Sequence, residues 1–184
     1  WFTFDEFLNT VYYAVSYIEV GPTLDAPLKR HVNAVFQHLF AREPQLDTSL
    51  VSTNPRSPSP QWDFKRVAVI SQFWFERHSV YRTLQPYAAA LRAAGYRLEL
   101  LNVGALQADA DLSLFAAHAV FDDPSDLKKA TDIIAHCRRE RYAIIWYPSV
   151  GMDWPTVYLS NWRLAPLQLA SPGHSVSTYG SLVD

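Results

Sequence analysis

Three residues of this 184-residue chain have the types and spacing needed to bind an anion or handle a proton. His78 opens the stretch His78-Ser-Val-Tyr-Arg82, and the two named side chains share a face if a helix begins there. A guanidinium beside a helix amino terminus favours an anionic group. A neutral imidazole near pH 7 can position or polarise reacting groups. The alternative is a capping histidine and a surface arginine.

The second histidine lies in a loop of small residues near the end of the chain. His174 follows a Pro-Gly turn, which lets the backbone come close to a ligand. Ser175, Ser177 and Thr178 add short donors that can reach phosphate or sugar hydroxyls. These residues, together with His78 and Arg82, are therefore candidates for a binding site. A loop histidine that faces solvent is the alternative.

Other motifs give no comparable signal. Asp109-Ala-Asp111 imitates an Asp-x-Asp metal site, but it lies in a polar loop rather than at a strand end, so no metal is expected. The sequence lacks the glycine-rich, phosphate-loop and zinc-protease motifs of dinucleotide oxidoreductases, nucleoside triphosphatases and zincins. The single Cys137 excludes an intramolecular disulfide and a zinc-cysteine cluster, and a reducing cytoplasm is the simplest location.

The composition is that of a globular protein, with 49% hydrophobic and 18% charged residues. A net charge of −2 gives no electrostatic case for binding nucleic acid or an anionic membrane surface. No apolar run has the length of a membrane span, and no signal peptide is visible. Because the chain opens on Trp1, we expect it to be an excerpt of a longer protein.

The elements that must position these residues fall into three parts. Helical spacing of apolar residues predicts two helices, over 3–19 and 26–41, that form a hairpin in a helical segment 1–41. The stretch 42–63 has the composition of a linker, with four prolines and several serines. Residues 64–184 then form the domain that carries both histidines.

This third part alternates between strands and helices, which implies a Rossmann-like α/β fold with a parallel sheet and flanking helices. The predicted strands cover 66–73, 96–103, 118–121, 142–147 and 165–170. The predicted helices cover 79–94, 111–117, 123–139 and 154–162. Since ligands bind beyond the carboxyl ends of parallel strands, we expect His78, Arg82 and His174 at one edge of the sheet.

Two stretches resemble a known family. The strand Arg163-Leu-Ala-Pro-Leu-Gln168, followed by Gly-His and a run of Ser and Thr, resembles the family-41 glycosyltransferases. These include the O-GlcNAc transferases and the bacterial N-glucosyltransferases that modify adhesins. Tyr147-Pro-Ser-Val-Gly-Met152 fits the adhesin type, in which a stretch similar to residues 78–82 lines the active-site cleft. The family usually has proline where this chain has Ser175.

The resemblance implies that residues 64–184 are the amino-terminal half of a GT-B glycosyltransferase. Such an enzyme transfers a hexose from a nucleotide sugar, such as a UDP-hexose, to an Asn or Ser/Thr side chain of an acceptor protein. Transfer is inverting and needs neither a metal nor a cofactor. The resemblance implies that His78 and His174 are catalytic. It also implies that substrate is bound by Arg82, Ser175, Ser177 and Thr178. The nucleotide is bound mainly by the carboxyl-terminal half, which would be this chain's partner. The alternative is a non-catalytic Rossmann-like scaffold or partner-binding module.

Overall fold

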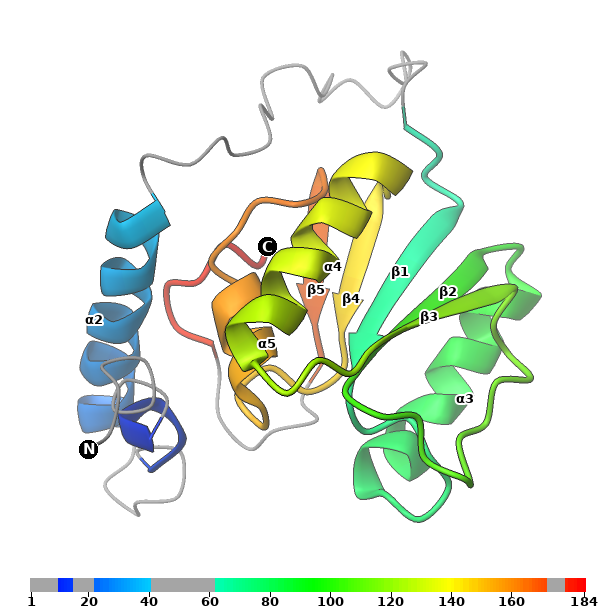
Figure 1. Cartoon of the computed structure of the whole chain (residues 1–184), viewed down its shortest axis with the longest axis horizontal. Helices are drawn as coiled ribbons and strands as arrows, with labels where there is room; N and C mark the ends of the chain where they lie inside the picture. The colour runs from blue at the N-terminus through cyan, green and yellow to red at the C-terminus, as the bar shows by residue number, and fades with distance from the viewer. Residues whose placement is uncertain (1–9, 15–21, 41–61, 172–177) are drawn as a thin grey trace.

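The computed structural model describes residues 10–14, 22–40, 62–171 and 178–184. At its centre is a five-stranded parallel sheet with the strand order β3-β2-β1-β4-β5, whose arrows all point the same way in Figure 1. The strands are β1 (Arg66–Ser71), β2 (Arg97–Val103), β3 (Ala117–Phe121), β4 (Ile144–Tyr147) and β5 (Leu167–Ala170). The helices are α2 (Pro22–Phe40), α3 (Ser79–Ala93), α4 (Asp126–Glu140) and α5 (Trp154–Leu159). The predicted α/β class with a parallel sheet is confirmed.

The central strands are buried because helices cover both faces of the sheet. All four residues of β4 are buried, and β1 is buried from its second residue onward. Such strands read as continuous apolar runs rather than as alternating patterns. The edge strand β3 is mostly exposed, which fits its mixed sequence Ala-His-Ala-Val-Phe.

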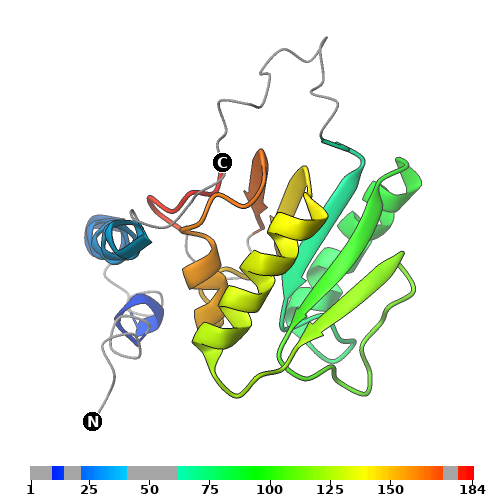
Figure 2. The ribbon, with the colours of Figure 1, turned by 45° about the horizontal axis from the view of Figure 1, so that its top comes forward.

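The helices form a layer on each side of the sheet (Figure 2). On one side, the buried residues Val80, Leu84 and Ala88 of α3 pack against a cluster that includes Val69 and Leu100. On the other side, α4 and α5 pack against the second cluster. The helix that follows β1 therefore covers one face of the sheet, and the helix that follows β4 covers the other face.

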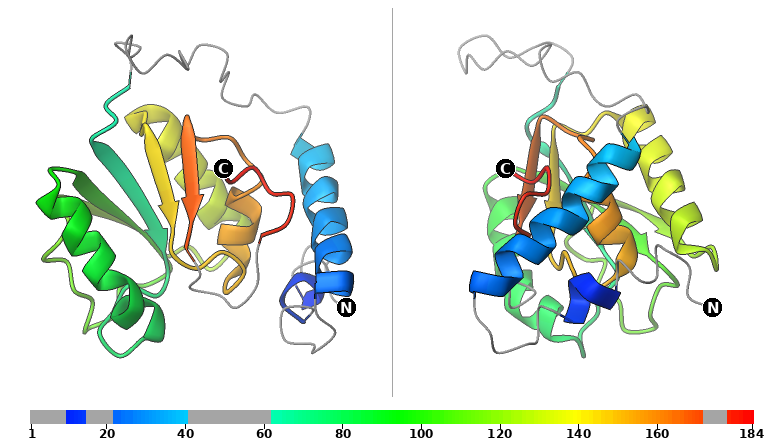
Figure 3. Two further views of the ribbon diagram at one scale, coloured as in Figure 1. Left: turned by 180° about the vertical axis from the view of Figure 1, so that it is seen from behind. Right: turned by 90° about the vertical axis from the view of Figure 1, so that its left-hand side faces the viewer.

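The helix α2 packs against α5 and the last described residues of the chain. Phe36 of α2 meets Trp154 of α5 edge to face, with ring centroids 6.1 Å apart. Figure 3 shows the carboxyl-terminal segment, in red, lying between α2 and the rest of the protein. Of the predicted helix 3–19, residues 10–14 are helical, and Tyr12 joins the same core as Phe36. The remainder of that helix and nearly all of the predicted linker lie outside the described residues.

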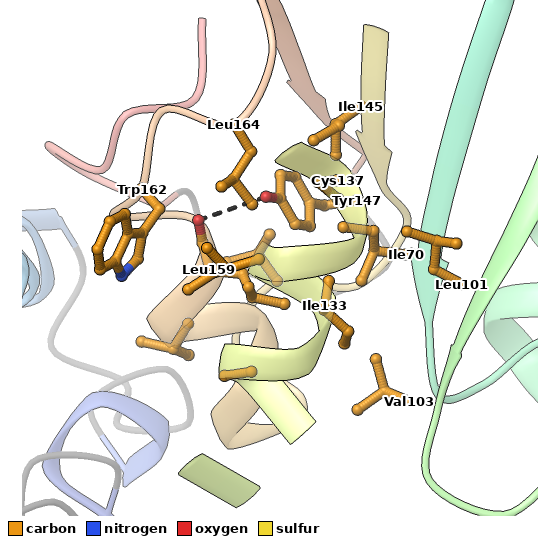
Figure 4. Close-up of a cluster of buried hydrophobic side chains, with 14 of the residues drawn as sticks. Ile70, Leu101, Val103, Ile133, Cys137, Ile145, Tyr147, Leu159, Trp162 and Leu164 are labelled. Carbon is orange, nitrogen blue, oxygen red and sulfur yellow. Dashed lines mark hydrogen bonds between the residues drawn. The ribbon is translucent and has the colours of Figure 1, made fainter. Parts of the chain in front are cut away.

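The core on the α4 side joins the sheet to two helices (Figure 4). Ile70 and Ile145 of the sheet face Ile133 and Cys137 of α4 in one buried cluster. The hydroxyl of the fully buried Tyr147 donates to the Leu159 carbonyl of α5 at 3.3 Å. Cys137 is a free thiol, and burial raises its pKa to about 12.

Two sequence-based predictions need correction. The short helix predicted over 111–117 is wrong, because this stretch forms turns that lead into β3. The Asp111 carboxylate accepts a hydrogen bond from the Ser113 backbone N–H at 2.9 Å, a local bond that competes with helix formation. The helix predicted over 26–41 begins earlier, at Pro22. Helix α3 begins at Ser79, as predicted, and contains Pro86.

A charged network ties the elements together at the amino edge of the sheet. The Arg66 guanidinium binds both carboxylate oxygens of Glu99 at 2.7 and 2.8 Å, and it also binds Glu140 at 3.0 Å. The Tyr142 hydroxyl donates to Glu99 at 2.9 Å. Burial alone would raise the pKa of Glu99, but these hydrogen bonds and the nearby positive charges lower it overall. A cavity of about 280 Å³ lies beside the network, and the same four side chains form part of its lining.

We expect that Glu99→Ala lowers the free energy of unfolding by about 3 kcal/mol, because it leaves the partly buried Arg66 without its main partner. The exposed pair between Lys128 and Asp132 is the matched control. Its removal by Lys128→Ala is expected to cost about 0.4 kcal/mol. Chemical denaturation measures both values. Equal losses in the two variants would contradict a stabilising role for the network.

Candidate functional site

The sheet order identifies the part of the molecule where a ligand is expected. The chain runs outward from β1 to β2 and β3, then returns to the other side of β1 with β4 and β5. Strand order reverses between β1 and β4, which is where ligands bind in open α/β sheets, outside the carboxyl ends of the strands. The residues that follow β1 and β4 are therefore the candidates.

His78 lies at this edge as the N-cap of α3. Its Nδ1 accepts a hydrogen bond from the Val80 backbone N–H at 3.2 Å, so the neutral ring carries its proton on Nε2. The ring stacks on Phe73, with centroids 4.5 Å apart and planes 20° apart. Burial, and secondarily the nearby Arg82 charge, lowers the pKa of His78 below its ordinary value. At neutral pH the imidazole therefore presents an N–H donor.

Arg82 lies one turn further along the same helix. Its backbone N–H donates to the His78 carbonyl at 3.2 Å, and its side chain is exposed. Within the described part of the chain, no hydrogen-bond or ion-pair partner engages its guanidinium. The first turn of α3 contains no acidic residue. This end of α3 can therefore receive an anion, with Arg82 as the charged group.

The loop between β2 and β3 contacts the residues around the amino end of α3. Arg77 forms an ion pair with Asp109 at 2.8 Å, and the Tyr81 hydroxyl donates to Asp111 at 2.6 Å. Both carboxylates of the Asp-x-Asp motif are thus engaged by neighbouring side chains. Within the described ranges, no group of three or more His, Cys, Asp or Glu side chains is placed to hold a metal ion.

Two tryptophan rings and a serine hydroxyl connect the ends of β1, β4 and β5. Trp74 follows β1 and meets Trp146 of β4 edge to face, with centroids 6.1 Å apart. The Trp146 indole N–H donates to the Ser171 hydroxyl at 2.6 Å. Ser171 directly follows β5, so side-chain contacts run across the carboxyl edge from the first strand to the last.

Of the other predicted site residues, one is described by the structure and three are not. His174, Ser175 and Ser177 lie outside the described residues. Thr178 is described, and its carbonyl accepts hydrogen bonds from Asn33 at 2.7 Å and from the Tyr12 hydroxyl at 3.3 Å. The structure therefore places His78 and Arg82 together on α3, whereas Thr178 lies against the amino-terminal helices.

Sequence reasoning missed Asp153, which follows β4 and caps α5. One carboxylate oxygen accepts from the Thr156 backbone N–H at 2.8 Å, while the other is buried without a partner among the described residues. Burial raises the pKa of Asp153 to about 7, and the negative Asp126 on α4 adds to this rise. Two hydrogen bonds from Thr156 and the positive Lys129 act in the opposite direction. In the sequence, an aspartate directly before Trp-Pro indicates a helix cap. It does not indicate that the pKa of this carboxyl is raised.

Comparisons with known proteins relate the chain to protein glycosyltransferases. No family model matches the chain. The UDP-glucose:protein N-beta-glucosyltransferase of Actinobacillus pleuropneumoniae serotype 5b (strain L20) is 27% identical over 164 residues, which is 85% of this chain and 24% of that protein. The enzyme of the same name from serotype 7 (strain AP76) is 33% identical over 75 residues, 38% of this chain and 12% of that protein. The chain is homologous to part of a protein glycosyltransferase.

A solved structure supports the same relationship at the level of the fold. A mutant O-GlcNAc transferase from Thermobaculum terrenum superposes with a TM-score of 0.68 at 15% sequence identity. The match covers 98% of this chain and 33% of that one. This glycosyltransferase-like chain therefore spans about a third or less of the proteins that it resembles.

We expect that Asp153→Asn makes stability less dependent on pH. The folded protein holds the Asp153 proton up to about pH 7, whereas an unfolded aspartate releases it near pH 4. The wild-type protein should therefore lose stability as the pH rises from about 4 through 7, while the variant keeps the cap without this loss. Between pH 5 and pH 8, the variant should gain about 2 kcal/mol relative to wild type in denaturation experiments.

Thr131→Ala on α4, at an exposed position without a titratable group, is the control. It should leave the slope of stability against pH almost unchanged. If the wild-type protein and the Asp153→Asn variant show parallel curves between pH 5 and pH 8, the raised pKa of Asp153 is wrong.

Proposed function

We propose that this chain is part of an inverting, metal-independent glycosyltransferase that moves a hexose from a nucleotide sugar to an Asn or Ser/Thr side chain of an acceptor protein. The observation that carries the proposal is the 27% identity to the UDP-glucose:protein N-beta-glucosyltransferase, which extends over 85% of this chain. The donor is then a UDP-hexose. The carboxyl-terminal half of the GT-B pair supplies most of the nucleotide contacts. We also propose a cytoplasmic location, based on the single cysteine.

In this reaction the bond between the sugar C1 and the diphosphate oxygen breaks while the acceptor atom bonds to C1 from the opposite face. The nucleoside diphosphate leaves with the bonding electrons, and the acceptor gives up a proton. Negative charge grows on the leaving diphosphate. A guanidinium at this place would stabilise that charge more than it stabilises the ground state, and Arg82 is the candidate.

His78 is suited to donate a hydrogen bond rather than to act as a general base. Its Nδ1 is occupied by the Val80 N–H, so the nitrogen that remains available already carries a proton in the neutral ring. This N–H can hold a phosphate or sugar oxygen in place. His174 is proposed as the second catalytic group, with Ser175, Ser177 and Thr178 as donors to the substrate.

In the full-length protein, Arg82→Ala is expected to lower kcat/KM for the nucleotide sugar by about tenfold to a hundredfold. A hydrogen bond to a charged group contributes about 1.5–3 kcal/mol, and the exposed Arg82 side chain adds little to folding. The measurement is transfer of radiolabelled sugar to an acceptor peptide, paired with thermal melts.

Arg92 in the last turn of α3 is the matched control, because it lies at the opposite end of the same helix. Arg92→Ala should leave kcat/KM within about twofold of wild type. Equal activity in all three proteins would remove Arg82 from the site. An absence of sugar transfer by the wild-type full-length protein would favour the non-catalytic scaffold instead.

A further inference from the structure

The imidazole of His78 contacts two phenylalanine rings of the loop that joins β1 to α3. Phe73 stacks on it, with ring centroids 4.5 Å apart and planes 20° apart. Phe75 meets the same imidazole at an interplanar angle of 62°, with centroids 5.3 Å apart. All three side chains are half-buried. The imidazole is therefore held by aromatic contacts in addition to its hydrogen bond.

Capping of α3 does not require these aromatic contacts. The Nδ1 of His78 caps the helix by accepting from the Val80 backbone N–H at 3.2 Å. At most helices a short polar side chain does this without any ring around it. One hydrogen bond leaves the plane of the imidazole free to turn, whereas a stacked ring and an edge-to-face ring favour one orientation. The two phenylalanines thus fix an orientation that a cap does not need.

A buried tryptophan anchors the two phenylalanines. Trp74 lies between them in the sequence and is 1% exposed. It meets Tyr81 of α3 and Trp146 of β4 edge to face, with centroids 5.6 and 6.1 Å away. The Phe73 backbone N–H donates to the hydroxyl of the fully buried Ser71 at 3.0 Å. Because the loop is tied to the core here, its phenylalanines have a fixed place beside His78.

The far end of the loop is fixed by Asp109, from the loop between β2 and β3. The Glu76 backbone N–H donates to the Asp109 carbonyl at 3.1 Å. The Asp109 carboxylate pairs with Arg77 at 2.8 Å, so these two charges offset each other. Arg82 on α3 is then the charge that acts on the imidazole, and it disfavours protonation. The ring is thus kept neutral in a loop that is held at both ends.

We propose that Phe73 and Phe75 are positioning residues for sugar transfer, which hold the His78 imidazole so that its Nε2–H is a fixed donor to a phosphate or sugar oxygen of the substrate. The inference rests on the proposed function. Nδ1 is occupied, and no hydrogen-bond partner engages Nε2 within the part of the chain that the structure describes. A donor that is already oriented needs no reorganisation during the reaction. This role accounts for two phenylalanines at a partly exposed edge of the sheet.

Nuclear magnetic resonance of this chain with labelled histidine tests the positioning without any assay of activity. A stacked phenyl ring shifts the His78 ring protons upfield, and burial holds the pKa of His78 below its ordinary value of about 6.5. Phe73→Ala should remove the upfield shift and move the pKa toward 6.5, whereas Phe73→Tyr, which keeps a ring, should preserve both. The His78 signal is identified by its loss in His78→Ala.

Tyr87→Ala is the matched control for these spectra, because Tyr87 is an aromatic residue of α3 that is 63% exposed. It should leave the chemical shift and the pKa of His78 as they are in the wild-type chain. A His78 signal and pKa in Phe73→Ala equal to those of the control would overturn the positioning role.

A double-variant experiment in the full-length protein tests the link to sugar transfer. Phe73→Ala and Phe75→Ala should each lower kcat about tenfold with little change in KM, because small misplacements of a reacting group reduce turnover. Phe73→Tyr and Tyr87→Ala should stay within about twofold of wild type. In a His78→Ala background, Phe73→Ala should have almost no further effect.

Losses that multiply in the double variant would overturn the positioning role, because Phe73 would then act independently of His78. If the full-length wild-type protein transfers no sugar, the proposed function fails. The spectra of the labelled chain still decide in that case whether the two rings hold His78.

Discussion

The parallel pairing of β1 with β4 is the constraint on which the candidate site depends. Val67 pairs with Ile144 and Val69 with Trp146, so the two strands end at the same edge of the sheet. Their crossovers pack on opposite faces, because α3 joins one core cluster and α5 the other. If either strand were reversed, His78 and Asp153 would lie at opposite edges of the sheet.

The two edges of the sheet use polar groups in different ways. At the amino edge, Arg66, Glu99, Glu140 and Tyr142 satisfy one another, so their charges hold strands and helix together. At the carboxyl edge, the Arg82 guanidinium and one oxygen of Asp153 lack partners among the described residues. The two edges thus differ in how fully their polar groups are paired within the described residues.

Much of the fold could be predicted from the sequence, because buried strands such as β1 and β4 are continuous apolar runs. The helix predicted over 111–117 was wrong because Leu112, Leu114 and Phe115 pack against the sheet from a turn, which periodicity does not distinguish from a short helix. The N-cap position of His78 follows from its place after a strand. The raised pKa of Asp153 depends on its burial beside α4. The hydrogen bond from Asn33 to the Thr178 carbonyl joins residues 145 positions apart. No local pattern encodes such contacts.

The single cysteine has a practical consequence for experiments on this chain. Cys137 is fully buried in the middle of α4, and its raised pKa keeps the thiol protonated at neutral pH. It should therefore react slowly with maleimides and similar reagents. A cysteine introduced at an exposed position of this chain, such as Thr83 on α3, should react much faster than Cys137. The natural sequence thus already provides a background for attaching one fluorophore or spin label beside Arg82.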